Sequence, residues 1–108
     1  MIPFAVLAAD EKSNIFETTA AGEVWVLIES DTADQDIELQ YSHSKLEAGF
    51  RTYVADGVDQ DLVSDDSKVY WLPGGLYFRF VAGSGNGDDT TCYLDGRHLR
   101  QYETPALS

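Results

Sequence analysis

The chain has 108 residues, of which 44% are hydrophobic and 12% aromatic. This is enough for one domain, residues 1–108, with a single core that needs no metal or disulfide. Nineteen acidic residues against seven basic ones give a formal net charge of −12, so the chain repels phosphate backbones and anionic lipid. The composition therefore predicts a globular domain that binds neither nucleic acid nor membrane.

Residues 1–9 are apolar and are followed at once by Asp10 and Glu11. They lack the basic start of a signal peptide and are too short to span a bilayer, so we expect an N-terminal strand or a docking arm. Cys92 has no second cysteine to pair with, which excludes an intrachain disulfide and indicates synthesis in a reducing compartment. Its place in a strand pattern predicts a small buried side chain and not a nucleophile.

Residues 23–29 form an apolar run of strand length, rich in β-branched side chains and preceded by Gly22. An apolar strand of this kind needs cover on both of its faces. We expect the domain core on one face and a loop, the N-terminal segment or a second subunit on the other.

Residues 37–42 alternate between apolar and polar side chains. This period of two predicts a strand with Ile37, Leu39 and Tyr41 on the core face and Glu38, Gln40 and Ser42 toward water. Residues 50–54 and 62–63 predict two shorter strands. Helical turns fit only residues 32–39 or 44–49, and neither segment keeps a period of 3.6, so we expect little helix.

Three further strands are predicted at residues 69–72, 76–81 and 90–94, and they read as an antiparallel meander. Pro73 and Gly74 suit the first connection, because a type II turn needs proline-like φ and then positive φ. A longer Gly-rich loop, residues 83–89, makes the second connection, and residues 97–108 suggest a final strand with a loose end. Six to eight short strands with regular turn signals predict an all-β, antiparallel β-sandwich, with a jelly roll as one candidate topology.

Clustered aspartates raise the possibility of calcium, which prefers carboxylate oxygens. Residues 31–36 and 56–61 share the spacing D-x-x-D-x-D, and Asp88 and Asp89 are adjacent. Neither segment has the spacing and distal glutamate of an EF-hand loop. Turn aspartates held by local backbone hydrogen bonds are the favoured interpretation, so we assign no metal site.

The sequence contains no arrangement that an enzyme of a familiar class would need. His43 and His98 lie far apart and outside any zinc-ligand spacing. The run Ser42-His43-Ser44 offers only neighbours in sequence, whose side chains alternate faces in a strand. The Gly-rich loop lacks the ending of a phosphate loop. We therefore predict a protein that is not an enzyme, with no catalytic residues and no cofactor.

Aromatic residues provide the better indication of a binding surface. Six of them exceed what one inward face of a small sandwich can hold: Trp25, Tyr53, Tyr70, Trp71, Tyr77 and Tyr93. Alternation in residues 76–81 also places Tyr77, Arg79 and Val81 on one outward face, a composition typical of protein interfaces. Core packing and a sugar-stacking platform are the alternatives. The predicted partner-binding residues are Trp25, Tyr53, Trp71, Tyr77, Arg79 and Val81.

The order of several strand patterns resembles small β-sandwich virion proteins of tailed bacteriophages. The patterns are Trp25-x-Leu27 in a strand, residues 37–42, and the run LPGGLYFRF at 72–80 before TTCYL at 90–94. Capsid cement or decoration proteins are the most similar kind, and the resemblance spans about residues 20–96. It implies a structural protein on the outer surface of the capsid, made in the host cytoplasm. Such a protein binds the major capsid protein, often as a dimer or trimer, and stabilises contacts between capsid subunits.

A carbohydrate-binding β-sandwich module is the main alternative, with a tail or fibre accessory domain as a further one. Trp71, Tyr70 or Tyr53 would stack on sugar rings, and loop carboxylates would bind sugar hydroxyls. This hypothesis predicts exposed rings in a groove. A cement protein predicts the same rings buried against the shell or between subunits.

Overall fold

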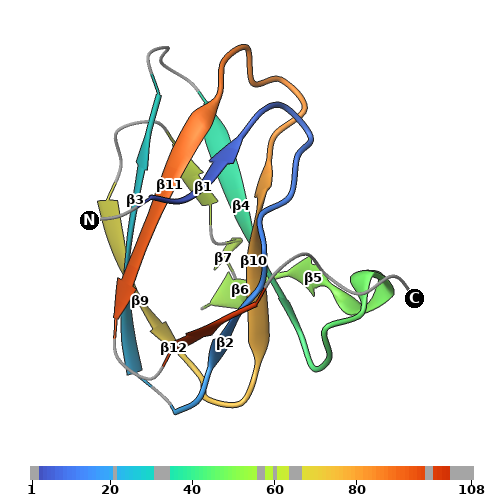
Figure 1. Ribbon diagram of the computed structural model, residues 1–108, viewed down its shortest axis with the longest axis vertical. Coiled ribbons are helices and arrows are strands. Elements are labelled where there is room, and N and C mark those ends of the chain that lie inside the picture. Colours follow the sequence, from blue (N-terminus) through green and yellow to red (C-terminus); the bar gives the residue numbers. More distant parts are fainter. Residues whose placement is uncertain are drawn as a thin grey trace.

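The computed structural model describes residues 3–20, 22–30, 35–55, 58–59, 61–63, 67–96 and 99–102. Two antiparallel sheets face each other, as the sequence predicted for a β-sandwich (Figure 1). The first sheet has the order β1 (Pro3–Leu7), β11 (Thr90–Gly96), β3 (Gly22–Glu29), β9 (Ser67–Leu72). The second has the order β12 (Leu99–Gln101), β2 (Phe16–Thr18), β10 (Tyr77–Ala82), β4 (Asp36–Ser42), β5 (Arg51–Thr52).

Three more short strands and one 3₁₀ turn complete the described elements. β8 (Asp61–Val63) pairs with the first half of β4, and β5 pairs with its second half. β6 (Val54–Ala55) and β7 (Val58–Asp59) form a separate two-stranded ribbon. The turn η1 (Glu47–Gly49) lies in one of the two segments that the sequence allowed for helical turns.

The strand order is that of a jelly roll. The chain passes from one sheet to the other at nearly every connection: β1, β3, β9 and β11 lie in one sheet, and β2, β4, β10 and β12 in the other. The interleaved orders β1-β11-β3-β9 and β2-β10-β4-β8 are the two four-stranded sheets of that topology. β12 and β5 extend the second sheet, which is one reason why the short strands outnumber the six to eight predicted.

The predicted meander is wrong, although all three of its strands exist. β9 pairs with β3, β10 pairs with β2 and β4, and β11 lies between β1 and β3. Residues 73–76 therefore cross the end of the sandwich and do not close a hairpin. The positive φ also falls one residue later than predicted, at Gly75 with φ of 80°. Thr18 anchors this crossing, because its hydroxyl donates to the Pro73 carbonyl at 2.5 Å.

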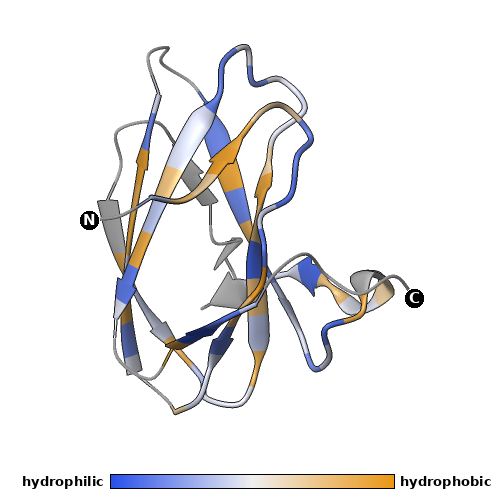
Figure 2. Cartoon of the chain, viewed as in Figure 1, coloured by the Kyte–Doolittle hydropathy of each residue, from blue (hydrophilic) through white to orange (hydrophobic). Residues whose placement is uncertain are grey.

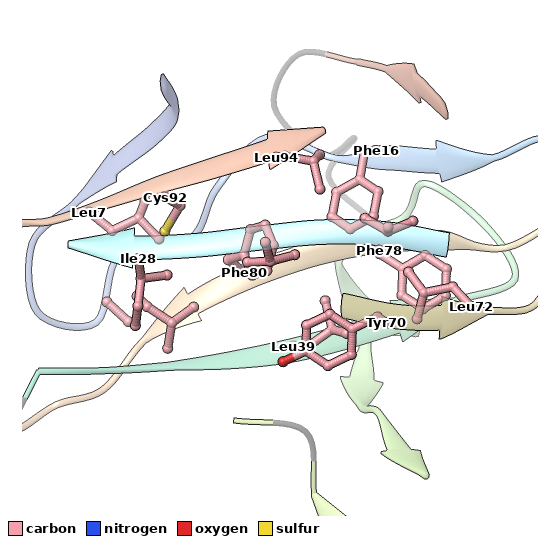
Figure 3. Close-up of a cluster of buried hydrophobic side chains, with 14 residues drawn as sticks. Leu7, Phe16, Ile28, Leu39, Tyr70, Leu72, Phe78, Phe80, Cys92 and Leu94 are labelled. Atoms are coloured by element: carbon pink, nitrogen blue, oxygen red, sulfur yellow. The ribbon is translucent and has the colours of Figure 1, made fainter. Parts of the chain in front are cut away.

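The core fills the space between the two sheets (Figure 3). Phe16, Phe78 and Phe80 are fully buried, with ring centroids 5.5 Å apart for Phe16 and Phe78 and 5.6 Å for Phe16 and Phe80. The first sheet contributes buried side chains at every second position of β3 and β11, and all of them except Thr90 are apolar. Figure 2 shows the resulting alternation of orange and blue residues along the strands. The predicted burial of Cys92 is confirmed, and burial raises the pKa of its thiol to about 12.

In β4, Ile37 and Leu39 are buried and Tyr41 packs against the core, as predicted. Ser42 was predicted to face water and is instead 2% exposed. Its hydroxyl accepts the backbone N–H of Ser44 at 3.1 Å, because the chain folds back over this end of the strand toward η1.

Both predicted terminal strands are present. β1 pairs with β11 along the edge of the first sheet, so the N-terminal segment does not cover β3. β12 pairs with β2, while Arg97, His98 and residues 103–108 of the predicted tail lie outside the described residues. In the described part of the chain, no helix has the length and apolar character needed to cross a membrane.

Candidate functional site

The outer side of the first sheet presents exposed apolar side chains, and we call this surface the tryptophan face. It consists of the outward residues of β1, β11, β3 and β9. Trp71 is 74% exposed and Trp25 is 42% exposed, while Val24, Val26, Tyr70 and Leu72 beside them in sequence are buried. Four of the five exposed large apolar residues among those described lie here: Val6, Trp25, Val69 and Trp71.

The strand register fixes how these side chains adjoin. Trp25 pairs with Val69, and Glu23 pairs with Trp71, so the two tryptophans are diagonal neighbours on adjacent strands. Leu27 pairs with Tyr93 on the other side of β3. Both of these are half-buried, and they continue the apolar surface toward β11.

Val6 extends the tryptophan face to the far edge of the sheet, where it pairs with Thr91. The residues Val6, Tyr93, Trp25 and Trp71 lie on four successive strands of the sheet. Each is displaced from the one before it by two residues along the strands, always in the same direction. These four residues therefore form a diagonal row. At a strand spacing of about 4.8 Å and a rise of about 3.3 Å per residue, the row is about 25 Å long.

Acidic side chains flank this row. Asp95 pairs with Trp25 and Glu23 pairs with Trp71, on one side of the diagonal. Glu29 pairs with Thr91 on the other side. All three carboxylates are on exposed residues, and the outward residues with described side chains on this face include no lysine or arginine. The surface is thus apolar along its centre and negative along its flanks.

The outward set predicted on β10 lies on the opposite side of the molecule and is largely covered. Tyr77, Arg79 and Val81 do share one face, as predicted, but Arg79 is only 3% exposed. Its guanidinium lies 4.3 Å from the centroid of the Phe50 ring, and its Nε donates to Gln40 Oε1 at 2.9 Å. This arginine is held inside the protein, because the segment after η1 folds over the sheet.

Tyr77 and Val81 are half-buried by neighbouring segments. The Tyr77 ring lies 6.0 Å from that of Tyr102, whose hydroxyl donates to Glu17 Oε1 at 2.5 Å. This hydrogen bond is the main cause that raises the pKa of Tyr102. Val81 forms a β-bridge with Lys12. The face of β10 is therefore packed by its own chain, unlike the tryptophan face.

Tyr53 is partly buried and packs against the core. Its ring meets Phe78 edge-on at 5.6 Å and Tyr41 at 6.0 Å. Its backbone N–H donates to the Leu39 carbonyl at 2.9 Å. The six predicted partner-binding residues thus lie in three places, and only Trp25 and Trp71 share an exposed surface.

Sequence reasoning missed Val6, Val69 and Leu27 as companions of the tryptophans, and it named Tyr93 as a surplus aromatic residue without including it among the partner-binding residues. For Leu27 the signal was present in the spacing Glu23-x-Trp25-x-Leu27-x-Glu29. Every second residue of a strand lies on the same face, so Trp25 and Leu27 share the face of the two glutamates, which should point toward water. Buried Tyr70 and Leu72 likewise imply that Val69 and Trp71 point outward. The pairing of these strands across the sheet was not readable from the sequence.

An open hollow adjoins the tryptophan face, lined by Gly22, Trp71, Leu72 and Pro73.

The residues that the structure describes contain no group of three or more metal-ligating side chains. Most of the two aspartate-rich segments lies outside the described residues or has no described side chains. His43 lines a different open hollow with Ser42 and Ser44.

No family model, curated protein or solved structure was found to match this chain.

Proposed function

We propose that this protein is a non-enzymatic structural protein of a tailed-phage virion, of the capsid decoration kind, which docks on the shell through the tryptophan face. The observation that carries the proposal is the exposure of Trp25 and Trp71 on one regular sheet surface. Exposing two indole rings to water is unfavourable unless a partner covers them, since each aromatic ring buries some 150–250 Å² when packed. Contiguous apolar patches with polar borders mark interaction surfaces.

The position of the tryptophan face suits adhesion. Its residues lie on paired strands and not on loops, so little conformational entropy is lost when a partner binds. The hollow that Gly22, Trp71, Leu72 and Pro73 line beside this face is open, unlike the concave pockets that enclose small ligands. Tryptophan and tyrosine are also the side chains that carry most binding energy at protein interfaces.

Repetition would supply the strength of attachment. Many copies bound to a symmetric shell add weak contacts into a stable layer, particularly where one copy spans two capsid subunits. The net charge of −12 would keep an abundant protein soluble before assembly. The jelly roll is compatible with this role because it occurs in viral capsid proteins, but it also occurs in lectins and does not imply either function.

Co-sedimentation tests the proposal. The probe is a set of expanded tailed-phage heads from which the native decoration protein has been removed. We expect the wild-type chain to pellet with heads and the double variant Trp25→Ser/Trp71→Ser to remain in the supernatant. Leu46→Ser, which removes an exposed leucine elsewhere, is the control and should pellet like wild type. Binding that is unaffected by the double variant, or no binding to any head in the set, would refute the proposal.

The solution mass is measured alongside, by light scattering with and without EDTA. If EDTA changes neither the solution mass nor the affinity for phage heads, the result supports an adhesive mechanism that does not use calcium. Loss of either on chelation would instead make the aspartate-rich segments part of the function.

A carbohydrate-binding module is the second candidate, and one observation favours it. Trp71, at 74% exposed, stands beside the hollow that Gly22, Leu72 and Pro73 line, which resembles a stacking platform with a recess. A glycan array tests this hypothesis. Sugar binding at this platform would be abolished by Trp71→Ala and retained by Trp25→Ala, whereas shell docking should weaken in both variants.

A further inference from the structure

The charge around the tryptophan face identifies the kind of surface that covers it. The diagonal row Val6, Tyr93, Trp25 and Trp71 supplies an apolar centre about 25 Å long. Glu23 and Asp95 lie along one flank of this row, and Glu29 lies on the other. A partner has to match both parts of this pattern.

We infer that the occupant of the tryptophan face is a protein surface of another chain that carries an apolar row with lysine or arginine on its flanks. Like charges placed opposite one another across an interface disfavour binding, whereas opposite charges guide the encounter and fix the register. This inference rests on the proposed function, and it specifies the chemistry of the docking site on the shell.

A second copy of this chain is the natural competitor, and the charge pattern disfavours it. In a two-fold dimer each face meets an identical face. Two such faces would bring six exposed carboxylates together around one apolar centre, since each contributes Glu23, Glu29 and Asp95. The net charge of −12 on each chain adds to this repulsion. A dimer or trimer of the expected kind would therefore have to form through another surface.

A synthetic amphipathic helix of leucine and lysine is a direct probe. About 18 residues at 1.5 Å per residue give an apolar stripe of about 27 Å flanked by ammonium groups. We expect it to bind the chain and shift tryptophan emission to shorter wavelength as water leaves the indole rings. A peptide with glutamate in place of lysine should not bind. A peptide with serine in place of leucine should bind weakly and leave the emission unchanged.

Paired variants separate this site from general attraction to an acidic protein. Trp71→Ser should weaken binding of the leucine-lysine helix by about tenfold, as expected for a central aromatic residue. Leu46→Ser should not change the affinity. Glu23→Gln/Asp95→Asn should weaken binding several-fold more than the control Asp10→Asn/Asp89→Asn, which removes two charges from other parts of the surface. Raising NaCl from about 50 mM to about 300 mM should weaken binding to the wild type.

In the peptide and mass measurements, two results would overturn the inference. One is an affinity for the peptide that Trp71→Ser and Glu23→Gln/Asp95→Asn both leave unchanged. The other is a concentration-dependent doubling of mass that Trp71→Ser abolishes, because this would identify a second copy as the occupant. Co-sedimentation with heads is a separate readout. If heads bind through the tryptophan face while Glu23→Gln/Asp95→Asn leaves that binding unchanged, the docking proposal stands, and the inference that the partner surface is basic is wrong.

Discussion

The hydroxyl of Thr90 is fully buried at the start of β11, and it has no hydrogen-bond partner among the described residues. A buried hydroxyl that makes no hydrogen bond costs about 1–3 kcal/mol relative to its hydration in water. We expect Thr90→Val, which keeps the shape of the side chain, to raise the free energy of unfolding by about 1 kcal/mol in denaturant titrations.

Thr18→Val is the matched control for that substitution. Thr18 is equally buried, but its hydroxyl donates to the Pro73 carbonyl. Removing this donor should lower the free energy of unfolding by about 1 kcal/mol. Equal destabilisation in the two variants would show that the Thr90 hydroxyl is also satisfied.

The buried thiol of Cys92 makes stability depend on alkaline pH. Its pKa is about 12 in the folded chain against 9.0 for an ordinary thiol. The unfolded chain therefore releases this proton above about pH 9, while the folded chain keeps it, so stability falls as the pH rises from about 9 toward 12. Between about pH 9 and 10.5 this amounts to about 1.5 kcal/mol.

Cys92→Ala removes this titration. The variant should be less stable than wild type at pH 7 because a small cavity forms, yet its free energy of unfolding should decline less steeply above pH 9. Urea titrations of both proteins at several pH values measure the two slopes. Parallel curves would show that the thiol ionises equally easily in the folded chain.

At the scale of elements, Asn86 ties the loop between β10 and β11 to the start of β4. Its Nδ2 donates to the Asp36 carbonyl at 2.9 Å, and the Asp36 N–H donates to its Oδ1 at 3.0 Å. The side-chain amide thus pairs with β4 as a neighbouring strand would. Gly83 also comes very close to Asp36, and its N–H donates to the same carbonyl at 3.1 Å.

Asn86→Ala should lower the free energy of unfolding by about 1–3 kcal/mol, because the Asp36 N–H loses its acceptor in a partly buried place. Gly85→Ala is the control in the same loop, and it should change stability by less than about 0.5 kcal/mol since nothing lies near the added methyl group. Thermal unfolding compares the three proteins. Faster hydrogen exchange at the Asp36 amide in Asn86→Ala would locate the effect, and unchanged exchange would contradict the assignment.

At the scale of the whole molecule, the jelly roll pairs strands that lie far apart in sequence. Pro3 pairs with Tyr93, and Phe16 pairs with Gln101. Such pairings require long loops to close before the contacts form, so we expect refolding on a scale of about milliseconds to seconds. Stopped-flow circular dichroism measures this rate. Refolding in microseconds would contradict the importance of the long-range pairings.

Much of the all-β fold was predictable from local signals. The apolar run at β3 has the length and the β-branched content of a strand, the alternation in β4 has a period of two, and both strands form where predicted. Cys92 was also correctly placed in the core. Part of the candidate site was predictable as well, because Trp25, Trp71 and Tyr93 were recognised as surplus aromatic residues.

Burial of the remaining candidates was not predictable. The alternation of side chains along β10 correctly placed Arg79 on the face opposite Phe78 and Phe80. Alternation cannot show which other segment of the chain covers that face. Phe50 covers Arg79 from a segment almost thirty residues away in the chain. Tyr53 packs against the core for the same reason, since the path of the chain after β4 brings its ring against Phe78.

Local sequence patterns predicted all the longer strands, although not β2, and they predicted which side chains within a strand point the same way, because successive side chains alternate between the two faces. Which strands are neighbours depends on contacts between distant parts of the chain. A short connection such as residues 73–76 can either close a hairpin or cross between sheets, and the choice depends on burying the inner faces of all the strands together. That choice placed β9 beside β3, and so brought Trp71 next to Trp25 on one exposed face.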